Sequence, residues 1–436
     1  MLTRPGEPDY ARAIEPDNSI TNQQPGFVVA ASRESDVVQA VHEATARSMS
    51  LVPQATGHGA GADVGGRDIL VDTSRLNSIT IDPQRRVAIV GSGVTWGALN
   101  AEAEKHGLLG PAGSAPSVSV SGYTFAGGAG WLVRRDGLAS SALRRVDFVD
   151  GAGVSRSASD DADDPTDRDA IWAFRGAGGV GIATRLEIGL FPAPRLHAGA
   201  LLWRASDLEA VVGAWVAAIG EVGGGVSSSL GVLHVPPAPQ FPEELRGSVA
   251  VHLAIADLDG PEGASALLEA VRTAAVPVSD TWGPSDAARL GTIHLDPTSA
   301  TPAMGAARWL TQKTTSLAAE LFATAVADDS PVVMMELRHV AGHESLTPGA
   351  LTSAPGPFIF HAVGAVGRST REQIEHGFAR ARTVWSAADV GFAPGSWVEG
   401  AAVVPDALPP HDLQRAIAIA DAIDPERRIR RSRLLG

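Results

Sequence analysis

Three glycine-rich segments in the first 190 residues constrain most strongly what this chain can fold into. They are 54–61 (QATGHGAG), 110–131 and 175–181, and each follows or precedes a stretch with the apolar pattern of a strand. Successive backbone N–H groups in such turns form concave anion sites, and glycine lets a phosphate or a flat ring approach closely. Any one segment alone would be an ordinary tight turn. Three in one domain, the first carrying the isolated His58, favour a large ligand with a pyrophosphate.

Length and composition limit the classes of protein that this chain can be. A chain of 436 residues exceeds one ordinary hydrophobic core, so we expect two domains or more. The formal charge of −14 argues against broad contact with nucleic acid, and the absence of cysteine excludes disulfides and thiolate metal sites. The N-terminus does not resemble a signal peptide, and no apolar stretch is long enough to span a membrane. We therefore expect a cytoplasmic protein that binds neither nucleic acid nor a membrane.

The first domain is expected to cover residues 1–194, with two α/β subdomains. The stretch FVVAASRESDVVQAVHEATARSMSLVPQATGHG predicts a strand, a helix with a capped start at 32–36, a second strand and the loop with His58. The segments DILVDTSRL and RRVAIVGSG predict strands with the turn IDPQ between them, and TWGALNAEAEKHGL predicts a helix closed by Gly107. The segment DFVDGAGVSRSAS predicts a hairpin with an Asp-Gly turn, and TRLEIGLFPAP a strand that ends at prolines.

A second domain is expected over residues 195–404. Strand patterns such as SLGVLHV, VAVHLAIAD, PVVMMELRHV and PFIFHAVGAV alternate there with helical patterns such as SDLEAVVGAWVAAIGE, GASALLEAVRTAA and TREQIEHGFARART. This order predicts an α+β domain with one antiparallel sheet whose helices cover one face. Residues 405–436 are expected to form a helix, LQRAIAIADAI, and a C-terminal tail.

Several motifs are present only in part. The turn in VAIVGSGVTWGAL has the spacing G-x-G-x-x-x-G, and GAGGVG at 176–181 leads into a strand pattern instead of a helix, so neither predicts a Rossmann site. His339 and His343 are four apart, but a strand running into a turn would not place them on one helix face, and we predict no metal site. No G-x-S-x-G motif supports a serine hydrolase.

The order and spacing of these segments resemble a family, the berberine-bridge-enzyme-like flavin oxidases. These are FAD-linked oxidoreductases of the vanillyl-alcohol-oxidase type, with a PCMH-type FAD-binding fold. The segments VPQATGHGAG, GLLGPAGSAPSVSVSGYTFAGGAGW and RGAGGVGIATRLEIGLFPAP resemble the FAD-binding domain. PVVMMELRHVAG resembles a strand of the family's substrate domain, and DAIDPERRIRRSRLLG resembles its return segment. The resemblance implies FAD as the cofactor and an α+β fold that combines this domain with a substrate domain.

The resemblance also implies which residues hold the cofactor. His58 matches the histidine that bonds the 8α-methyl group of the flavin in relatives, so it is expected to tether the cofactor. Such a bond would make the flavin a stronger oxidant. The backbone around His58 is expected to hold the pyrophosphate, the second glycine-rich segment to line the ribityl chain and the ring, and the third to line the adenine side. The expected contacts are Ala55, Thr56, Gly57, Gly59 and Ala60, then Ser114, Val118, Ser121, Gly122 and Tyr123, then Gly181 and Ile182.

Four departures from the family concern the reaction more than the cofactor. Ala115 replaces the cysteine that makes a second flavin bond in some relatives, and the loop RGAGGVG is one residue shorter than usual. Trp397 stands where relatives carry a tyrosine that serves as the base. Ser432 and Leu434 replace C-terminal asparagines that face the flavin in relatives, so Ser432 is expected at the cofactor.

The base must then come from elsewhere. Glu336, Arg338 and His339 lie on one predicted strand, with the first two on one face and His339 on the other, so one of these sets should face the substrate. Glu336 and Arg338 could instead form a structural ion pair. Trp397 is expected to form a wall of the pocket or to stack on a flat substrate.

Three hypotheses for the function follow. The first is an FAD-dependent oxidase or dehydrogenase that takes a hydride from a small alcohol, amine or natural-product-like substrate to flavin N5, with molecular oxygen reoxidising the flavin to give hydrogen peroxide. The second keeps the flavin in a pocket that cyclises or binds a small molecule without redox chemistry. The third is a small-molecule binder that has lost the flavin.

Overall fold

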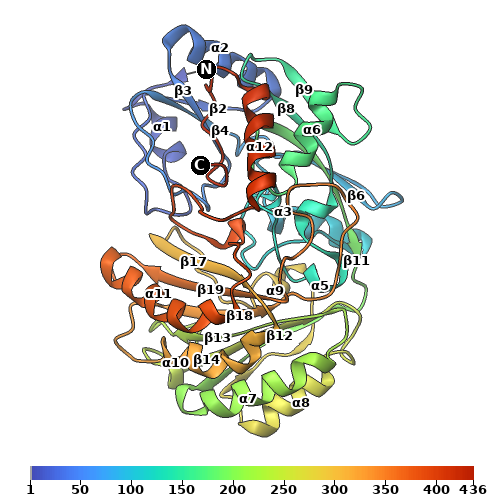
Figure 1. Ribbon diagram of the computed structural model, residues 1–436, viewed down its shortest axis with the longest axis vertical. Coiled ribbons are helices and arrows are strands. Elements are labelled where there is room, and N and C mark those ends of the chain that lie inside the picture. Colours follow the sequence, from blue (N-terminus) through green and yellow to red (C-terminus); the bar gives the residue numbers. More distant parts are fainter. Residues whose placement is uncertain (1) are drawn as a thin grey trace.

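The computed structural model describes residues 2–436, the side chain of residue 9 excepted, and has an α+β fold as the sequence predicts. Figure 1 shows two halves stacked along the long axis, and both chain ends lie in the upper half. The strands of the upper half come from residues 2–192, and those of the large sheet in the lower half come from residues 197–365. We retain the division at 194 and 404 as our proposal for the domain boundaries. No helix among the described residues is long and apolar enough to cross a membrane.

The first sheet of the upper half carries the loop with His58 at its edge. Its strand order is β1-β2-β4-β3, in which β2, β4 and β3 are parallel and β1 is antiparallel to β2. The helix between β2 and β3 begins at Glu34, and Arg33 occupies its N-cap position. Just before it, the Ser32 amide donates to Asp36 Oδ2 over 2.9 Å. The elements are β1 (Leu2–Thr3), α1 (Pro8–Ala13), β2 (Phe27–Ala30), α2 (Glu34–Arg47), β3 (Ser50–Gln54) and β4 (Asp68–Asp72).

The second sheet is antiparallel, in the order β5-β6-β10-β8-β9. The predicted hairpin forms as β8 and β9, and the segment after GAGGVG is the strand β10, which confirms that no Rossmann helix starts there. The strand β5 was missed, because the predicted turn IDPQ begins inside it. The strands are β5 (Ile79–Asp82), β6 (Val87–Gly91), β8 (Leu143–Val149), β9 (Ser155–Ser159) and β10 (Ile182–Gly189), with the short pair β7 (Leu108–Leu109) and β11 (Phe191–Pro192) beside them. The helices are α3 (Trp96–Ala103), α4 (Val120–Phe125), α5 (Val133–Asp136) and α6 (Pro165–Phe174).

The lower half is one antiparallel sheet with helices on one face, as the sequence predicts. Its order is β15-β12-β14-β13-β18-β19-β17, and β16 also pairs with β12. Sequence analysis did not single out β12 or β17. The strands are β12 (His197–Arg204), β13 (Val226–His234), β14 (Val249–Asp257), β15 (Ser279–Asp280), β16 (Gly283–Pro284), β17 (Ala303–Leu310), β18 (Met334–His339) and β19 (Phe358–Ala365).

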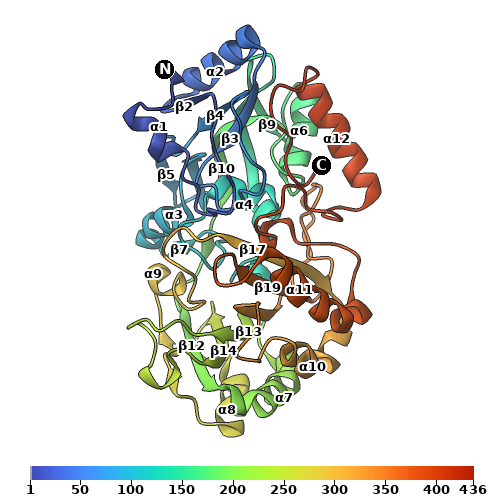
Figure 2. The ribbon, with the colours of Figure 1, turned by 90° about the vertical axis from the view of Figure 1, so that its left-hand side faces the viewer.

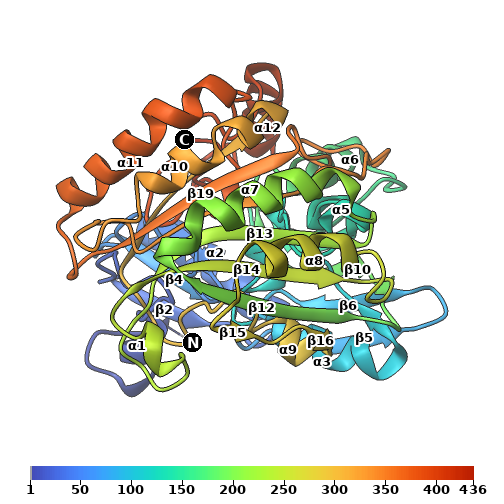
Figure 3. The same cartoon turned by 90° about the horizontal axis from the view of Figure 1, so that it is seen from below.

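Helices cover the face of this sheet that points away from the upper half. Figure 3 shows α7, α8, α10 and α11 in front of the strands when the molecule is seen from below. The core beneath these helices is apolar and includes Trp203, Trp215, Met335, Leu337 and Phe360. The helices are α7 (Leu208–Ala218), α8 (Ser265–Ala274), α10 (Ala318–Ala323) and α11 (Arg371–Trp385), while the short α9 (Ala287–Leu290) packs near α3.

The opposite face of the sheet meets the upper half. Figure 2 shows β17 and β19 lying directly below α4 and β7. Trp309 and Ile359 of the large sheet belong to the same buried apolar cluster as Trp96 and Phe125 of the upper half. Because one apolar cluster joins the two halves, the space between them is a fixed part of the fold.

The C-terminal segment returns to the upper half. The helix α12 (Pro410–Ile423) packs on α6, and the tail then runs beside β3, where the Leu51 amide donates to the Arg428 carbonyl over 2.7 Å and the Arg430 amide donates to the Leu51 carbonyl over 2.8 Å. The segment before α12 also closes on the loop with His58, since a Cβ at Gly61 would overlap the backbone of Ala401. The segment before α12 and the loop therefore fold against one another.

We predict that Gly61→Ala lowers the free energy of unfolding by about 1–3 kcal/mol, because the added methyl group would overlap the Ala401 carbonyl. The control is Gly66→Ala, since a Cβ there has no atom within 4 Å. Urea unfolding of the two variants beside the unsubstituted protein measures the difference. Equal stability of the two variants would contradict the close contact between the loop and the segment before α12.

Candidate functional site

The glycine-rich segments converge on one cavity of about 340 Å³ in the upper half. The loop 52–62 forms one side, α4 and the segment 178–183 form the floor, and the segments 396–402 and 429–434 close it from the C-terminal side. Ser114 and Ile182, which we expected at the cofactor, lie outside this lining. The expected residues that do line the cavity are Ala55, Thr56, Gly57, His58, Gly59, Ala60, Val118, Ser121, Gly122, Tyr123, Gly181 and Ser432.

The chemistry of the lining fits FAD. Among the described residues, the backbone N–H groups of Thr56, Gly57 and His58 donate no hydrogen bond, so they are free for the oxygens of a pyrophosphate. Gly57 has φ +72°, a left-handed conformation that favours glycine and turns the loop back on itself. Ser92 and Tyr123 also line the cavity, and their buried hydroxyls have no partner among the described residues. These donors match a ligand that is rich in acceptors.

His58 lies on this lining with its side chain about two-fifths exposed. Its Nδ1 is 3.9 Å from Asp17 Oδ2. Burial raises the pKa of Asp17, and the nearby His58 opposes that shift. The imidazole is thus accessible from the cavity and has one carboxyl neighbour that can orient it.

The strand β18 divides its polar side chains between two faces. Successive side chains of a strand point to opposite faces, so Glu336 and Arg338 face the upper half and His339 faces the helices. His339 stacks on Phe358 with ring centroids 5.2 Å apart, and burial together with Arg134 lowers its pKa to about 3. We therefore correct the expected set and remove His339, because it lies on the covered face of the sheet.

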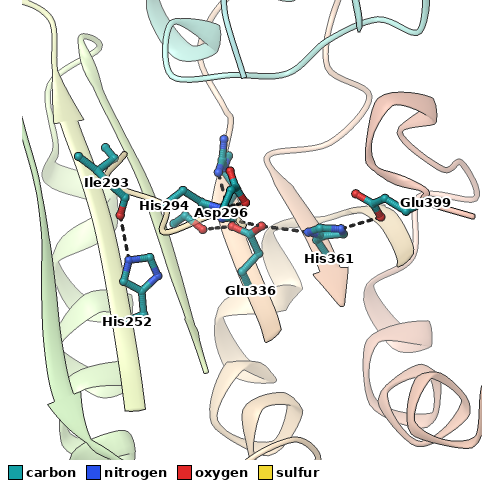
Figure 4. Close-up of polar contacts among 9 residues, drawn as sticks. His252, Ile293, His294, Asp296, Glu336, His361 and Glu399 are labelled. Atoms are coloured by element: carbon teal, nitrogen blue, oxygen red, sulfur yellow. Dashed lines mark hydrogen bonds and ion pairs between the residues drawn. The ribbon is translucent and has the colours of Figure 1, made fainter. Parts of the chain in front are cut away.

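Glu336 is the buried centre of a chain of acids and histidines, shown in Figure 4. We call this set, Asp296–His294–Glu336–His361–Glu399, the acid–histidine chain. His294 Nδ1 is 2.8 Å from Asp296 Oδ1, and its Nε2 is 3.1 Å from Glu336 Oε1. His361 Nδ1 is 3.0 Å from the same Glu336 oxygen, and its Nε2 is 3.2 Å from Glu399 Oε2. The Ser229 hydroxyl donates to the other oxygen of Glu336.

Different parts of the fold bring these groups together. Glu336 on β18 lies opposite His361 on β19 in the strand register, so neighbouring strands place them side by side. His294 and Asp296 come from the connection between α9 and β17, and Glu399 comes from the segment that leads to α12. The chain therefore runs across the sheet and ends at Glu399, which also lines the FAD cavity.

Charge balance explains why these groups can be buried. Burial would lower the pKa of both histidines, but Asp296 and Glu336 raise that of His294 to about 10, and Glu399 and Glu336 raise that of His361 to about 9. Burial would raise the pKa of Glu336, yet His294 and Arg338 hold it well below its ordinary value. Buried charges persist only when paired, so the histidines are imidazolium ions and Glu336 is a carboxylate at neutral pH.

Arg338 lies between two indole rings. Its guanidinium carbon is 4.2 Å from the ring centroid of Trp131 and 4.5 Å from that of Trp397, within the range of a cation–π contact. It is fully buried, its nearest carboxylate oxygen is Glu336 Oε2 at 3.6 Å, and its nitrogens make no hydrogen bond among the described residues. Trp397 is buried here and also meets His361 edge to face, with centroids 5.0 Å apart.

Sequence reasoning missed His294, Asp296, His361 and Glu399. His361 had a signal, since a histidine interrupts the apolar strand pattern PFIFHAVGAV. Glu399 follows Trp397 by two residues, in a segment that we singled out only for its missing tyrosine. His294 and Asp296 lie in a connection without a regular pattern, where no local signal marks them. No group of three or more His, Asp or Glu side chains among the described residues is arranged to hold a metal ion.

The paired imidazolium ions should make stability depend on pH. A histidine whose pKa is raised on folding stabilises the fold fully below its unfolded pKa and loses this effect as the pH rises through the folded value. For His361 the window runs from about pH 6.5 to about pH 9. We predict that His361→Asn lowers the free energy of unfolding at pH 6 by on the order of a few kcal/mol, and by less at pH 9.

Denaturant unfolding at both pH values measures this difference. His411→Asn serves as the control, because this histidine is exposed on α12 and should show little effect at either pH. A His361→Asn effect that is equal at pH 6 and pH 9 would contradict the raised pKa.

Comparisons with known proteins identify the cofactor. Residues 25–159 match the family described as FAD binding domain. The (R)-6-hydroxynicotine oxidase of Paenarthrobacter nicotinovorans is 33% identical over 192 residues, which cover 43% of this chain and 41% of that protein. The matched region spans less than half of the length of the curated relatives that the chain matches.

The whole fold is similar to that of solved structures. The crystal structure of 6-hydroxy-D-nicotine oxidase from Arthrobacter nicotinovorans aligns with a TM-score of 0.83 and 22% identity, over 100% of this chain and 97% of that one. The berberine bridge enzyme-like protein 1 of Physcomitrella patens aligns with a TM-score of 0.79 and 18% identity, also over 100% and 97%. At these identities the likeness shows the fold. Residues 25–159 are thus an FAD-binding domain with FAD as its cofactor, and the predicted resemblance of the chain to the berberine-bridge-enzyme-like FAD-linked oxidoreductases is confirmed.

Proposed function

We propose that this chain is an FAD-dependent oxidoreductase that removes a hydride from a small alcohol, amine or natural-product-like substrate. The observation that carries the proposal is that the FAD cavity and the acid–histidine chain meet at Glu399. Such an oxidation needs a redox cofactor and, next to it, groups that can transfer a proton. Molecular oxygen as the electron acceptor, with hydrogen peroxide as the product, is part of the proposal, as is a cytoplasmic location.

The bound FAD would accept the hydride, and the residues of the chain would position the substrate and manage its proton. Trp131 and Trp397 are buried with the Arg338 guanidinium between their rings, so stacking of Trp397 on a flat substrate, which the sequence led us to expect, is not part of the proposal. Arg338 is fully buried and lies outside the cavity lining, so it acts through Glu336, whose Oε2 is 3.6 Å away. Glu336 holds His294 and His361 in place as cations, so the role that we propose for Glu336 and Arg338 is charge balance beside the site.

One observation favours a second candidate function. Trp397 replaces the family's tyrosine base and is buried against Arg338 and His361, so no hydroxyl is available at that position. A pocket that binds or cyclises a small molecule beside an inert flavin would tolerate this change. We set aside the hypothesis of a binder without flavin, because residues 25–159 match an FAD-binding domain.

Anaerobic mixing of the FAD-loaded protein with candidate alcohols and amines tests the proposal. We expect at least one of them to bleach the flavin absorbance, followed by recovery of the colour and release of peroxide when air is admitted. A flavin that stays yellow with every ligand that demonstrably binds would favour the second candidate. Recovery with a dye but not with air would indicate a dehydrogenase.

We further propose that His58 tethers the flavin by an 8α-histidyl bond, supported by its accessible position on the cavity lining. The prediction is that acid-precipitated protein keeps its yellow colour and that His58→Ala releases the colour into the supernatant. The control variant His411→Ala should keep the colour in the pellet, since His411 is exposed on α12. Yellow supernatant from the unsubstituted protein would show that FAD is held without a bond.

A further inference from the structure

The oxidation proposed above requires a group that accepts a proton from the substrate. Glu336 is the carboxylate that the sequence pattern indicated, but its oxygens are not accessible to a substrate. One of its oxygens lies within hydrogen-bond distance of His294 and His361, the other accepts from Ser229, and only 2% of the residue is exposed. A carboxylate with its acceptor sites occupied is a weak base, since protonation would break those bonds.

Glu399 lies at the other end of the same chain and is open on one side. One of its oxygens, Oε2, lies 3.2 Å from His361 Nε2, while the side chain remains 17% exposed and lines the FAD cavity together with Ser121 and Tyr123. Among the described residues, no hydrogen bond or ion pair other than that with His361 involves its carboxylate. A proton arriving from the cavity could therefore bind without breaking the contact to His361.

Gly305 on the neighbouring strand β17 leaves room for the Glu399 carboxylate. The Gly305 amide on β17 donates to the Glu399 carbonyl over 3.1 Å, and a Cβ at Gly305 would overlap Glu399 Oε2. The lack of a side chain at Gly305 thus leaves the space into which the carboxylate folds over the sheet.

Charged groups surround Glu399 from several elements. His361 on β19 faces it directly, and Glu336 on β18 lies behind His361. Arg433 from the C-terminal tail is half-buried near it and donates to the carbonyls of Val398 and Gly395, and its charge interacts with that of Glu399. The two cations hold an anion at the cavity wall, and Glu336 in turn holds His361.

We propose that Glu399 accepts the proton that the substrate's hydroxyl or amine loses, and that His361 is the residue that positions it. The proposal rests on the proposed function. In the balanced step, the substrate's O–H or N–H bond breaks and its proton bonds to the Glu399 carboxylate. The substrate C–H bond breaks with its electron pair, and this hydride reduces the FAD. The substrate leaves as a carbonyl compound or an imine, and Glu399 later returns its proton to water at the cavity.

The first experiment measures the rate of anaerobic flavin reduction from pH 5 to pH 10, with 1-phenylethanol and N-methylbenzylamine as the probes, supplemented by any faster substrate found above. We expect Glu399→Gln to slow reduction by about 10²–10⁴-fold near neutral pH. Gly305→Ala should slow reduction as well by displacing the carboxylate, although Glu399 itself is kept. Glu375→Gln on the exposed side of α11 is the matched control and should leave the rate unchanged.

The second experiment needs no substrate. With labelled histidine, nuclear magnetic resonance follows the His361 imidazole, assigned through His361→Asn, as the pH is raised. We expect a midpoint near 9 in the unsubstituted protein and a lower midpoint in Glu399→Gln. The visible spectrum and FAD content of each variant show that the cofactor site is intact.

The outcomes separate the two proposals. If a probe reduces the flavin of the unsubstituted protein but Glu399→Gln reacts within threefold of it, only the inference about Glu399 fails. The inference about Glu399 also fails if Glu336→Gln loses the reaction while Glu399→Gln keeps it. It fails as well if the His361 imidazole titrates near its ordinary value of about 6.5. If nothing reduces the unsubstituted protein, the proposed function fails and the role of Glu399 fails with it, whatever the titration shows.

Discussion

The pairing of one buried carboxylate, that of Glu336, is the interaction on which the site depends. A carboxylate in the interior is stable only with cations and donors around it, and Glu336 obtains them from a neighbouring strand, from the connection before β17 and from Arg338 on its own strand. Meeting this requirement fixes the position of His294 and of His361. The pairing of Glu336 therefore orders the connection between α9 and β17. It also holds the acid–histidine chain across the sheet face that meets the FAD-binding domain.

The alternation of side chains along the strands keeps this polar chain apart from the apolar core. On β18, Met335 and Leu337 pack beneath the helices, while Glu336 and Arg338 face the FAD-binding domain. On β19, Phe358 and Phe360 face the helices and His361 faces the other side. One sheet thus supports a helix-covered apolar core on one face and carries the acid–histidine chain on the other, because the two faces carry different side chains.

The C-terminal third of the chain completes both parts of the site. The segment around Glu399 closes the FAD cavity and ends the acid–histidine chain, and the tail lies beside β3, next to the loop with His58. Gly61 and Gly305 allow these close approaches, since a side chain at either position would overlap the returning segment. The same stretch of backbone therefore contributes to the FAD cavity and to the proton transfer that we propose.

The sequence by itself determined much of the fold and the cofactor. Period-two patterns such as VAVHLAIAD placed most strands, the helical patterns placed α7, α8, α11 and α12, and the glycine-rich loops with His58 indicated FAD, because these signals are local. Only the tertiary structure decided that Glu336 is enclosed, that His339 lies under the helices, and that Glu399 reaches the cofactor cavity. Those facts depend on which strands are neighbours and on where residues far apart in the sequence meet, and short-range patterns carry no record of such contacts.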